Sequence, residues 1–144
     1  MENSTMGRVL TEAAIENLGD LYAVERAAMA PNDVRRIVVH DALVDTGATV
    51  LSLPTRLIRQ LGLVKRGTKR VTTSQGICEA DKYEAVRLTI QGRDCPVDVL
   101  EVPDGVPVLV GQIPLENLDL VVDPRGGKLI GNPEHGGEHM FEMY

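Results

Sequence analysis

The stretch Ala42-Leu43-Val44-Asp45-Thr46-Gly47-Ala48 decides how this sequence is interpreted. Three apolar residues, typical of the end of a buried strand, lead directly into a carboxylate on a tight glycine turn. Such a turn holds the carboxylate rigidly and removes part of its water. Desolvation favours the neutral form of a carboxyl group, and a neighbouring carboxylate adds to this effect, which suits general acid or base chemistry. Because Asp, Thr and Gly are common in turns, the motif alone also fits an ordinary surface turn.

The segments around this motif predict an all-β fold, a closed sandwich or barrel-like domain with one or two short helices. Strands are expected at residues 9–17, 34–44, 69–74, 77–90, 96–102, 106–111 and 128–131, with residues 21–28 as the hairpin partner of the first. Helical spacing of apolar residues predicts a short helix over residues 53–63, with Ser52 as N-cap and Gly62 as C-cap. A second short helix is expected at residues 114–120.

The chain contains a weak internal repeat of pattern. Residues 37–61 and residues 97–120 both read as strand, turn, apolar strand, glycine and helix. In the first copy Asp45-Thr46-Gly47 follows the apolar strand, whereas in the second Gly111 follows Val108-Leu109-Val110 directly. One chain therefore supplies one carboxylate of this kind.

Together these segments resemble the retroviral-type, or retropepsin-like, single-domain aspartic proteases of the bacterial branch. The resemblance is carried by residues 42–48, by Val108-Leu109-Val110-Gly111, by a glycine-tipped hairpin at residues 69–84, and by residues 111–118 with Val121-Val122-Asp123-Pro124 after them. We accordingly expect a retropepsin-like domain over residues 1–131 and a polar C-terminal tail over residues 132–144.

The resemblance implies catalytic roles for Asp45, Thr46 and Gly47. Two carboxylates must share one proton, so that one Asp45 activates a water molecule and the other donates to the scissile carbonyl. Since each chain has one such carboxylate, the resemblance implies a homodimer with a two-fold axis through the site. Thr46 would bond across that axis, and Gly47 would allow the substrate backbone to approach. The expected activity is endopeptidase hydrolysis of extended polypeptides, fastest on the acid side of neutral pH.

The resemblance also implies a substrate-binding set. Ala48 would hydrogen-bond the substrate through its main chain, and the hairpin tip would close over an extended peptide. The tip residues concerned are Gln75, Gly76 and Ile77. The alternative function is a non-catalytic dimeric β module that binds extended peptides in the same groove.

Composition excludes several other classes of protein. The 144 residues carry 15 Lys and Arg against 21 Asp and Glu, a net charge of −6, which argues against nucleic acid or an anionic membrane as partner. No apolar run is long enough to span a membrane. The two cysteines, Cys78 and Cys95, suit free thiols in a reducing cytoplasm, and no cofactor is expected.

Two charged segments have competing interpretations. Glu134-His135 and Glu138-His139 have ligand-like spacing, but Gly136-Gly137 between them weakens any helix, so a solvated tail is favoured over a metal site. The cations Lys65-Arg66 and Lys69-Arg70 are interpreted as a solvated face of the hairpin rather than a nucleic-acid patch.

Overall fold

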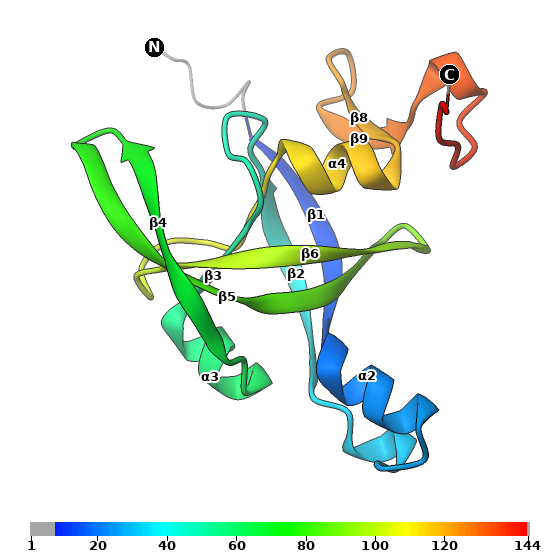
Figure 1. Cartoon of the computed structure of the whole chain (residues 1–144). Coiled ribbons are helices and arrows are strands. Elements are labelled where there is room, and N and C mark those ends of the chain that lie inside the picture. The colour runs from blue at the N-terminus through cyan, green and yellow to red at the C-terminus, as the bar shows by residue number, and fades with distance from the viewer. Residues whose placement is uncertain (1–7, 144) are drawn as a thin grey trace.

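The fold is a ring of β-strands, seen here in a computed structural model that describes residues 8–143 (Figure 1). Seven strands follow the order β1-β2-β7-β3-β6-β5-β4, and β1 also pairs with β5, so the first six close on themselves. A separate two-stranded sheet is formed by β8 and β9. The predicted all-β closed domain is confirmed; residues 1–7 of the predicted domain and Tyr144 of the predicted tail lie outside the described residues.

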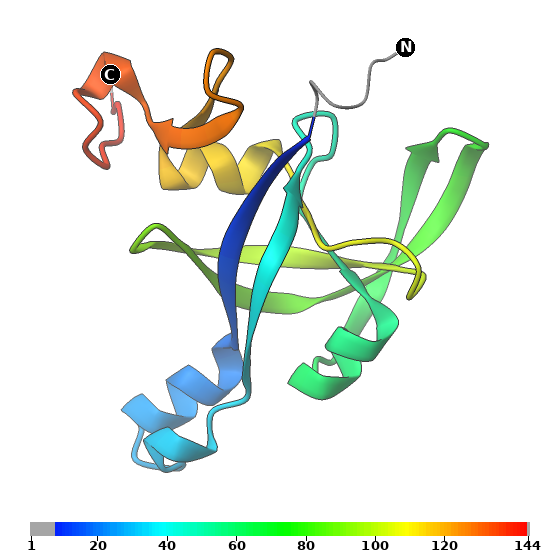
Figure 2. The ribbon, with the colours of Figure 1, turned by 180° about the vertical axis from the view of Figure 1, so that it is seen from behind.

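The nine strands contain a little under half of the chain's residues. β1 and β2 run side by side and antiparallel, as Figure 2 shows from behind. The strand bounds are β1 Val9–Asn17, β2 Arg36–Val44, β3 Leu51–Pro54, β4 Lys65–Thr73, β5 Gly76–Ile90, β6 Arg93–Val102, β7 Leu109–Val110, β8 Leu120–Asp123 and β9 Lys128–Gly131.

The interior of the ring is filled with aliphatic side chains. Residues with no exposed surface come from different strands, among them Ile15 of β1, Leu51 of β3, Leu88 of β5 and Val110 of β7. Truncating a buried aliphatic side chain of this kind typically costs about 2–5 kcal/mol of folding free energy. This core fixes the ends of β2 and β7, from which the candidate site is built.

The segment after β1 is a helix, so the predicted strand at residues 21–28 is wrong. Helix α2 spans Leu18–Glu25, and the side chain of Asn17 caps it by accepting a hydrogen bond of 3.0 Å from the Asp20 backbone N–H. The Arg35 guanidinium holds Asp20 with bonds of 2.9 Å and keeps its pKa below the ordinary value. An Asn cap followed by an acidic residue in the first turn is a helix-start signal, but the same residue types are also common in hairpin turns.

Both predicted helices are present, but each begins at a different residue from the one predicted. Helix α3 spans Thr55–Leu61 and ends at Gly62, whose φ of 65° is the left-handed conformation that glycine adopts readily. The predicted cap is wrong: Ser52 lies in β3, and Pro54 occupies the N-cap position without a side-chain bond. Helix α4 spans Gln112–Leu118. Two short 3-10 turns, Pro31–Asp33 and Pro133–His135, complete the helical elements of the described chain.

The C-terminal tail is tied to the end of α4 rather than fully solvated. The carboxylate of Asp119 accepts hydrogen bonds from His135 Nδ1 at 2.7 Å and from the Met140 backbone N–H at 3.1 Å. His135 Nε2 lies 3.0 Å from Glu142, and Arg93 donates to the carbonyl oxygen of Gly137. The His135 and Asp119 side chains are only 12% and 8% exposed. We call this set of contacts the tail clasp.

The tail clasp should make folding stability depend on pH. Hydrogen bonds from His135 to Glu142 and Asp119 raise the pKa of His135 above 6.5. The bond from His135 also lowers the pKa of Asp119 below 3.8. The folding stability that His135 contributes is therefore fully present below pH 6.5, and it is lost as the pH rises through the pKa of His135 in the folded protein. The aspartate contribution is complete above pH 3.8 and is lost on acidification. We expect the clasp to stabilise the protein most between those two pH values.

Unfolding of the parent and of His135→Gln, followed by denaturant titration from pH 4 to 9, checks this dependence. The stability difference between the two proteins should shrink above pH 6.5. His40→Gln is the matched control, because the His40 pair with Glu12 is exposed and screened by solvent. An equal difference at pH 5 and pH 9 would contradict the clasp.

No helix within residues 8–143 has the length and apolar character needed to cross a membrane. Cys78 is exposed, Cys95 is buried, and both are free thiols.

Candidate active site

Asp45 begins a short loop, residues 45–50, which we call the Asp45 loop. Its backbone N–H donates to the Val110 carbonyl of β7 at 2.9 Å, so the loop starts on a hydrogen bond to the neighbouring strand. The Ala48 N–H donates to the Asp45 carbonyl at 3.0 Å, which closes the turn. The Gly47 N–H donates to the Asp45 carboxylate, Oδ1, also at 3.0 Å. Both the backbone and the side chain of Asp45 are therefore held in place.

The exposure of the Asp45 loop changes abruptly along the chain. Val44 is buried, Asp45 is half-buried, Thr46 and Gly47 are exposed, and Ala48 is again half-buried. The carboxylate thus lies at the boundary between the core and the surface of a single chain. Such a position leaves it accessible to water and to a second molecule.

Gly111 lies directly beneath the Asp45 loop and supports it. Strand β2 runs parallel to β7, with Leu43 opposite Leu109 and Val44 opposite Val110. Immediately after β7, the Gly111 N–H donates to the Val50 carbonyl at 2.9 Å.

The first residues of α4 continue this support. The N–H groups of Gln112 and Ile113 donate to the carbonyls of Ala48 and Thr49, each at 2.9 Å. A methyl group at Gly111 would lie 2.5 Å from the Val50 carbonyl oxygen and under 3 Å from two further backbone carbons. Only glycine permits this approach, a requirement that the Val110-Gly111 motif did not reveal by itself.

The predicted substrate-binding residues of the hairpin lie at its tip. Gln75 is in the turn between β4 and β5, and its N–H donates to Thr73 Oγ1 at 3.2 Å. Gly76 has a φ of 108°, which disfavours any other residue there, and Ile77 is 66% exposed. Figures 1 and 2 place this tip and the Asp45 loop at the same end of the molecule. The structure therefore brings both predicted groups to one end, each on its own element.

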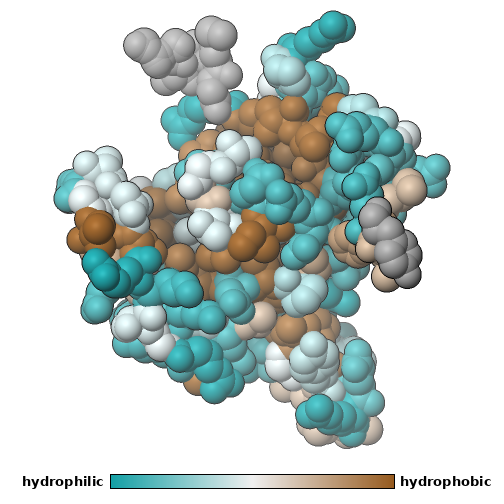
Figure 3. Space-filling view, turned by 45° about the horizontal axis from the view of Figure 1, so that its top comes forward, coloured by the Kyte–Doolittle hydropathy of each residue, from teal (hydrophilic) through white to brown (hydrophobic). Residues whose placement is uncertain are grey.

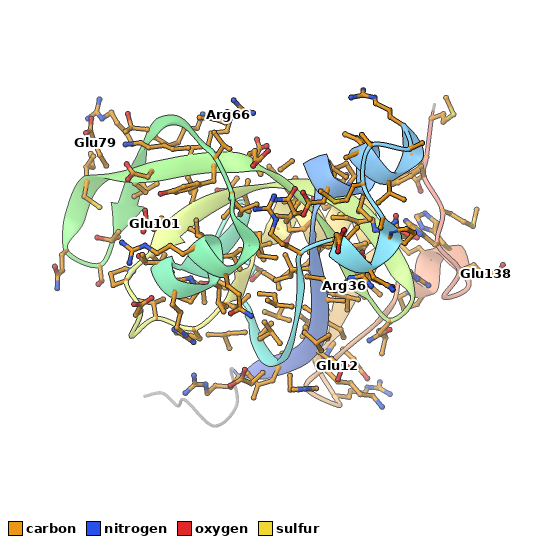
Figure 4. The ribbon with its side chains drawn as sticks, turned by 90° about the horizontal axis from the view of Figure 1, so that it is seen from below. Glu12, Arg36, Arg66, Glu79, Glu101 and Glu138 are labelled. Atoms are coloured by element: carbon orange, nitrogen blue, oxygen red, sulfur yellow. The ribbon has the colours of Figure 1, made fainter. Side chains whose placement is uncertain are left out.

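A hollow of about 280 Å³, which sequence analysis missed, lies between the middle of the hairpin and the start of α3. Thr55, Glu79, Asp81 and Glu101 contribute to its lining. Figure 4 shows Glu101 beside α3 and Glu79 toward the outer part of the hairpin.

Glu101 is fixed within this hollow. Its carboxylate accepts hydrogen bonds from the Thr55 hydroxyl and, at 3.1 Å, from the Tyr83 hydroxyl. Burial and the bond to Glu101 raise the pKa of Tyr83 above 10.

The two histidines of the tail form hydrogen bonds with different residues. His135 belongs to the tail clasp, whereas His139 Nε2 lies 2.9 Å from the Asn117 carbonyl. Across residues 8–143, no group of three or more His, Cys, Asp or Glu side chains is arranged to hold a metal ion.

The sequence profile of a family described as aspartyl protease matches residues 32–113, more than half of the chain. The chain belongs to the aspartyl protease family. The matched region runs from the 3-10 turn Pro31–Asp33, just before β2, to the first turn of α4, and it includes all seven predicted site residues. No curated protein sequence matches the chain.

Membership of this family supports aspartic protease activity in general, that is, hydrolysis of peptide bonds. β1, α2, β8, β9 and the tail clasp lie outside the matched region. The core of the family thus coincides with the elements that carry the Asp45 loop and the hairpin.

Proposed function

We propose that this protein is an aspartic endopeptidase that cleaves extended polypeptides with a dyad made of Asp45 from two copies of the chain. One observation carries the proposal: the Asp45 loop holds a half-buried carboxylate rigidly at the surface, and each chain has one such loop. Two carboxylates about 3 Å apart share one proton, because both cannot ionise easily at that distance. In a symmetric dimer, both chains use the same surface patch at the interface, so the two Asp45 carboxylates can face each other across the two-fold axis.

The end of the molecule that carries the Asp45 loop has the character of an interface. Ile113, in the first turn of α4, is 43% exposed although it is apolar. In the β8–β9 hairpin, Val122 and its partner Leu129 pack on the core, while Val121 and Ile130 share the opposite, partly exposed face. Figure 3 shows apolar surface gathered at this end. A second copy would remove this surface from water.

In the proposed mechanism, the ionised Asp45 takes a proton from a bound water molecule, and that water attacks the scissile carbonyl carbon. The protonated Asp45 of the other copy donates its proton to the carbonyl oxygen, which yields a tetrahedral intermediate without a covalent adduct. Thr46 links the two loops, and the Ala48 main chain binds the substrate. The hairpin tip with Gln75 closes over the peptide and excludes water.

Hydrolysis of an unfolded protein tests the proposal. Purified protein should cleave casein near pH 5, and pepstatin, a peptide that mimics the tetrahedral intermediate, should block the cleavage. Uncut casein, with the protein shown to be folded and dimeric, would overturn the proposed activity.

As part of the same proposal we place the enzyme in the cytoplasm, where two free thiols remain reduced.

Dilution should reduce activity more steeply than in proportion to concentration. Because each site needs two chains, the rate should fall with about the square of the chain concentration once this drops below the dimer dissociation constant. Initial rates over a dilution series, with sedimentation velocity on the same samples, check the relation. A rate that stays proportional to concentration while the protein becomes monomeric would contradict a shared site.

A further inference from the structure

Strand β4 is the outermost strand of the sheet. It ends the sheet order, and within residues 8–143 it pairs only with β5. The second edge of β4 therefore presents backbone N–H and C=O groups that no other described strand satisfies. Figures 1 and 2 show β4, rather than β5, on the side of the hairpin turned toward the Asp45 loop. A peptide lying between the hairpin and that loop would meet this edge.

This edge is strongly basic in an otherwise acidic protein. β4 carries Lys65, Arg66, Lys69 and Arg70 and no acidic residue. Residues 65–84 together hold five cationic and three anionic side chains, a net charge of +2, whereas the whole chain carries −6. The hairpin is therefore a positive element that attracts negatively charged peptides to a protein that otherwise repels them.

The two cations at the base of the hairpin already have partners. Lys65 Nζ lies 3.2 Å from Asp81 Oδ1, and Arg66 lies 3.9 Å from Glu84. Figure 4 shows Arg66 nearer the base of the hairpin than Glu79. These pairs are internal to the hairpin.

The two cations nearer the tip differ from those at the base. Lys69 lies opposite Ala80, and Arg70 lies opposite Glu79, but neither forms an ion pair within the part of the chain that the structure describes. Both are exposed. Their charges are therefore available to a bound chain.

We infer that the free edge of β4 selects acidic polypeptide substrates, with Lys69 and Arg70 binding carboxylates on the substrate. The inference rests on the proposed peptidase function and specifies its substrate class. A substrate strand would form hydrogen bonds with the β4 backbone, and these bonds do not depend on the substrate sequence. The two cations would supply the preference for acidic side chains.

The position of the preferred acidic residue follows from strand geometry. Lys69 and Arg70 lie four and three residues before Thr73, the last residue of β4, which is about 10–13 Å at the usual rise per residue. A substrate strand paired with β4 has the same rise per residue. The preferred acidic residue of the substrate would therefore lie about three or four positions from the scissile bond under the hairpin tip. Two copies related by a two-fold axis would give this preference on both sides of the bond.

Peptide binding to the full-length Asp45→Asn protein tests the inference without consuming the peptide. Three labelled peptides share a central apolar pair and carry Glu, Gln or Lys three and four positions away on each side. Fluorescence anisotropy at low salt should show the Glu peptide binding about 1.5- to 5-fold more tightly than the Gln peptide for each acidic residue. The difference should largely disappear at about 1 M salt, where charges are screened within a few ångströms.

Charge reversal provides the decisive comparison. With Lys69→Glu added, one cation and one anion remain at positions 69 and 70, so the preference for the Glu peptide over the Lys peptide should largely disappear. Arg26→Glu is the matched control: it changes the net charge equally, at the exposed C-terminal end of α2 at the opposite end of the molecule, and should keep the parent order.

Three results would overturn the inference. The first is equal affinity of the Asp45→Asn protein for the three peptides, and the second is the same loss of preference with Arg26→Glu. The third is increased self-association of Lys69→Glu with an unchanged peptide order, which would mean that the cations only protect the edge from other copies. Failure of the parent protein to hydrolyse casein would overturn the proposed function instead, while the binding order would still decide the substrate class.

Discussion

Replacing Asp45 by asparagine should lower kcat/KM by about 10²- to 10⁴-fold while leaving the fold intact. In the proposed dimer this one substitution removes both carboxylates, and with them the group that takes a proton from water and the group that donates one. The asparagine side chain has nearly the same shape, and its carbonyl oxygen can still accept the 3.0 Å bond from the Gly47 N–H. The loss is therefore expected in the chemical step rather than in the position of the Asp45 loop.

Initial rates on a peptide mapped from the casein digest, together with thermal unfolding, measure this effect. Asp41→Asn is the matched control, because Asp41 is an exposed residue of β2, four residues before Asp45. The control should retain parent activity. Full activity in Asp45→Asn would overturn the dyad. Peptide affinity that survives in Asp45→Asn, with hydrolysis absent even from the parent, would favour the non-catalytic binding module.

Gly111→Ala should damage both stability and activity. The added methyl group would lie 2.5 Å from the Val50 carbonyl oxygen, 2.7 Å from the Thr49 carbonyl carbon and 2.8 Å from that of Ala48. These are backbone atoms, so relief of the clash must displace the Asp45 loop itself. Overpacking of this kind typically costs about 1–3 kcal/mol of folding free energy. The φ of −88° is accessible to alanine, so the cost is steric rather than conformational.

The loss of activity should exceed what the loss of stability explains. Displacement of a catalytic group by about 1 Å can cost about 10²-fold in rate, and the Asp45 loop has to move by a similar distance. Measuring kcat/KM well below the unfolding temperature separates the two effects. Gly105→Ala is the matched control, since a methyl group there meets no atom within 4 Å. Parent-like stability and activity in Gly111→Ala would show that the loop adapts and that Gly111 does not position Asp45.

Local sequence signals predicted the elements whose patterns are strong. The apolar residues before Asp45 predicted β2, and the glycine after residue 61 predicted the end of α3 at a left-handed residue. Helix α2 was missed because its polar first turn resembles a hairpin turn, and because what distinguishes it, the bond between Asp20 and Arg35, joins residues that are 15 apart. β3 was absorbed into the predicted helix because Leu53 continues the helical spacing of Leu57 and Leu61.

Sequence alone determined the family, the all-β class and the identity of the candidate carboxylate, because each follows from short contiguous patterns. Tertiary structure alone decided that β7 lies beside β2, that Gly111 supports the Asp45 loop from beneath, and that the tail is clasped to Asp119. It also left the basic edge of β4 without a partner strand among residues 8–143. The physical reason is that local propensities act over a few residues, whereas the choice of partner between segments some sixty residues apart depends on which arrangement buries the whole core at once.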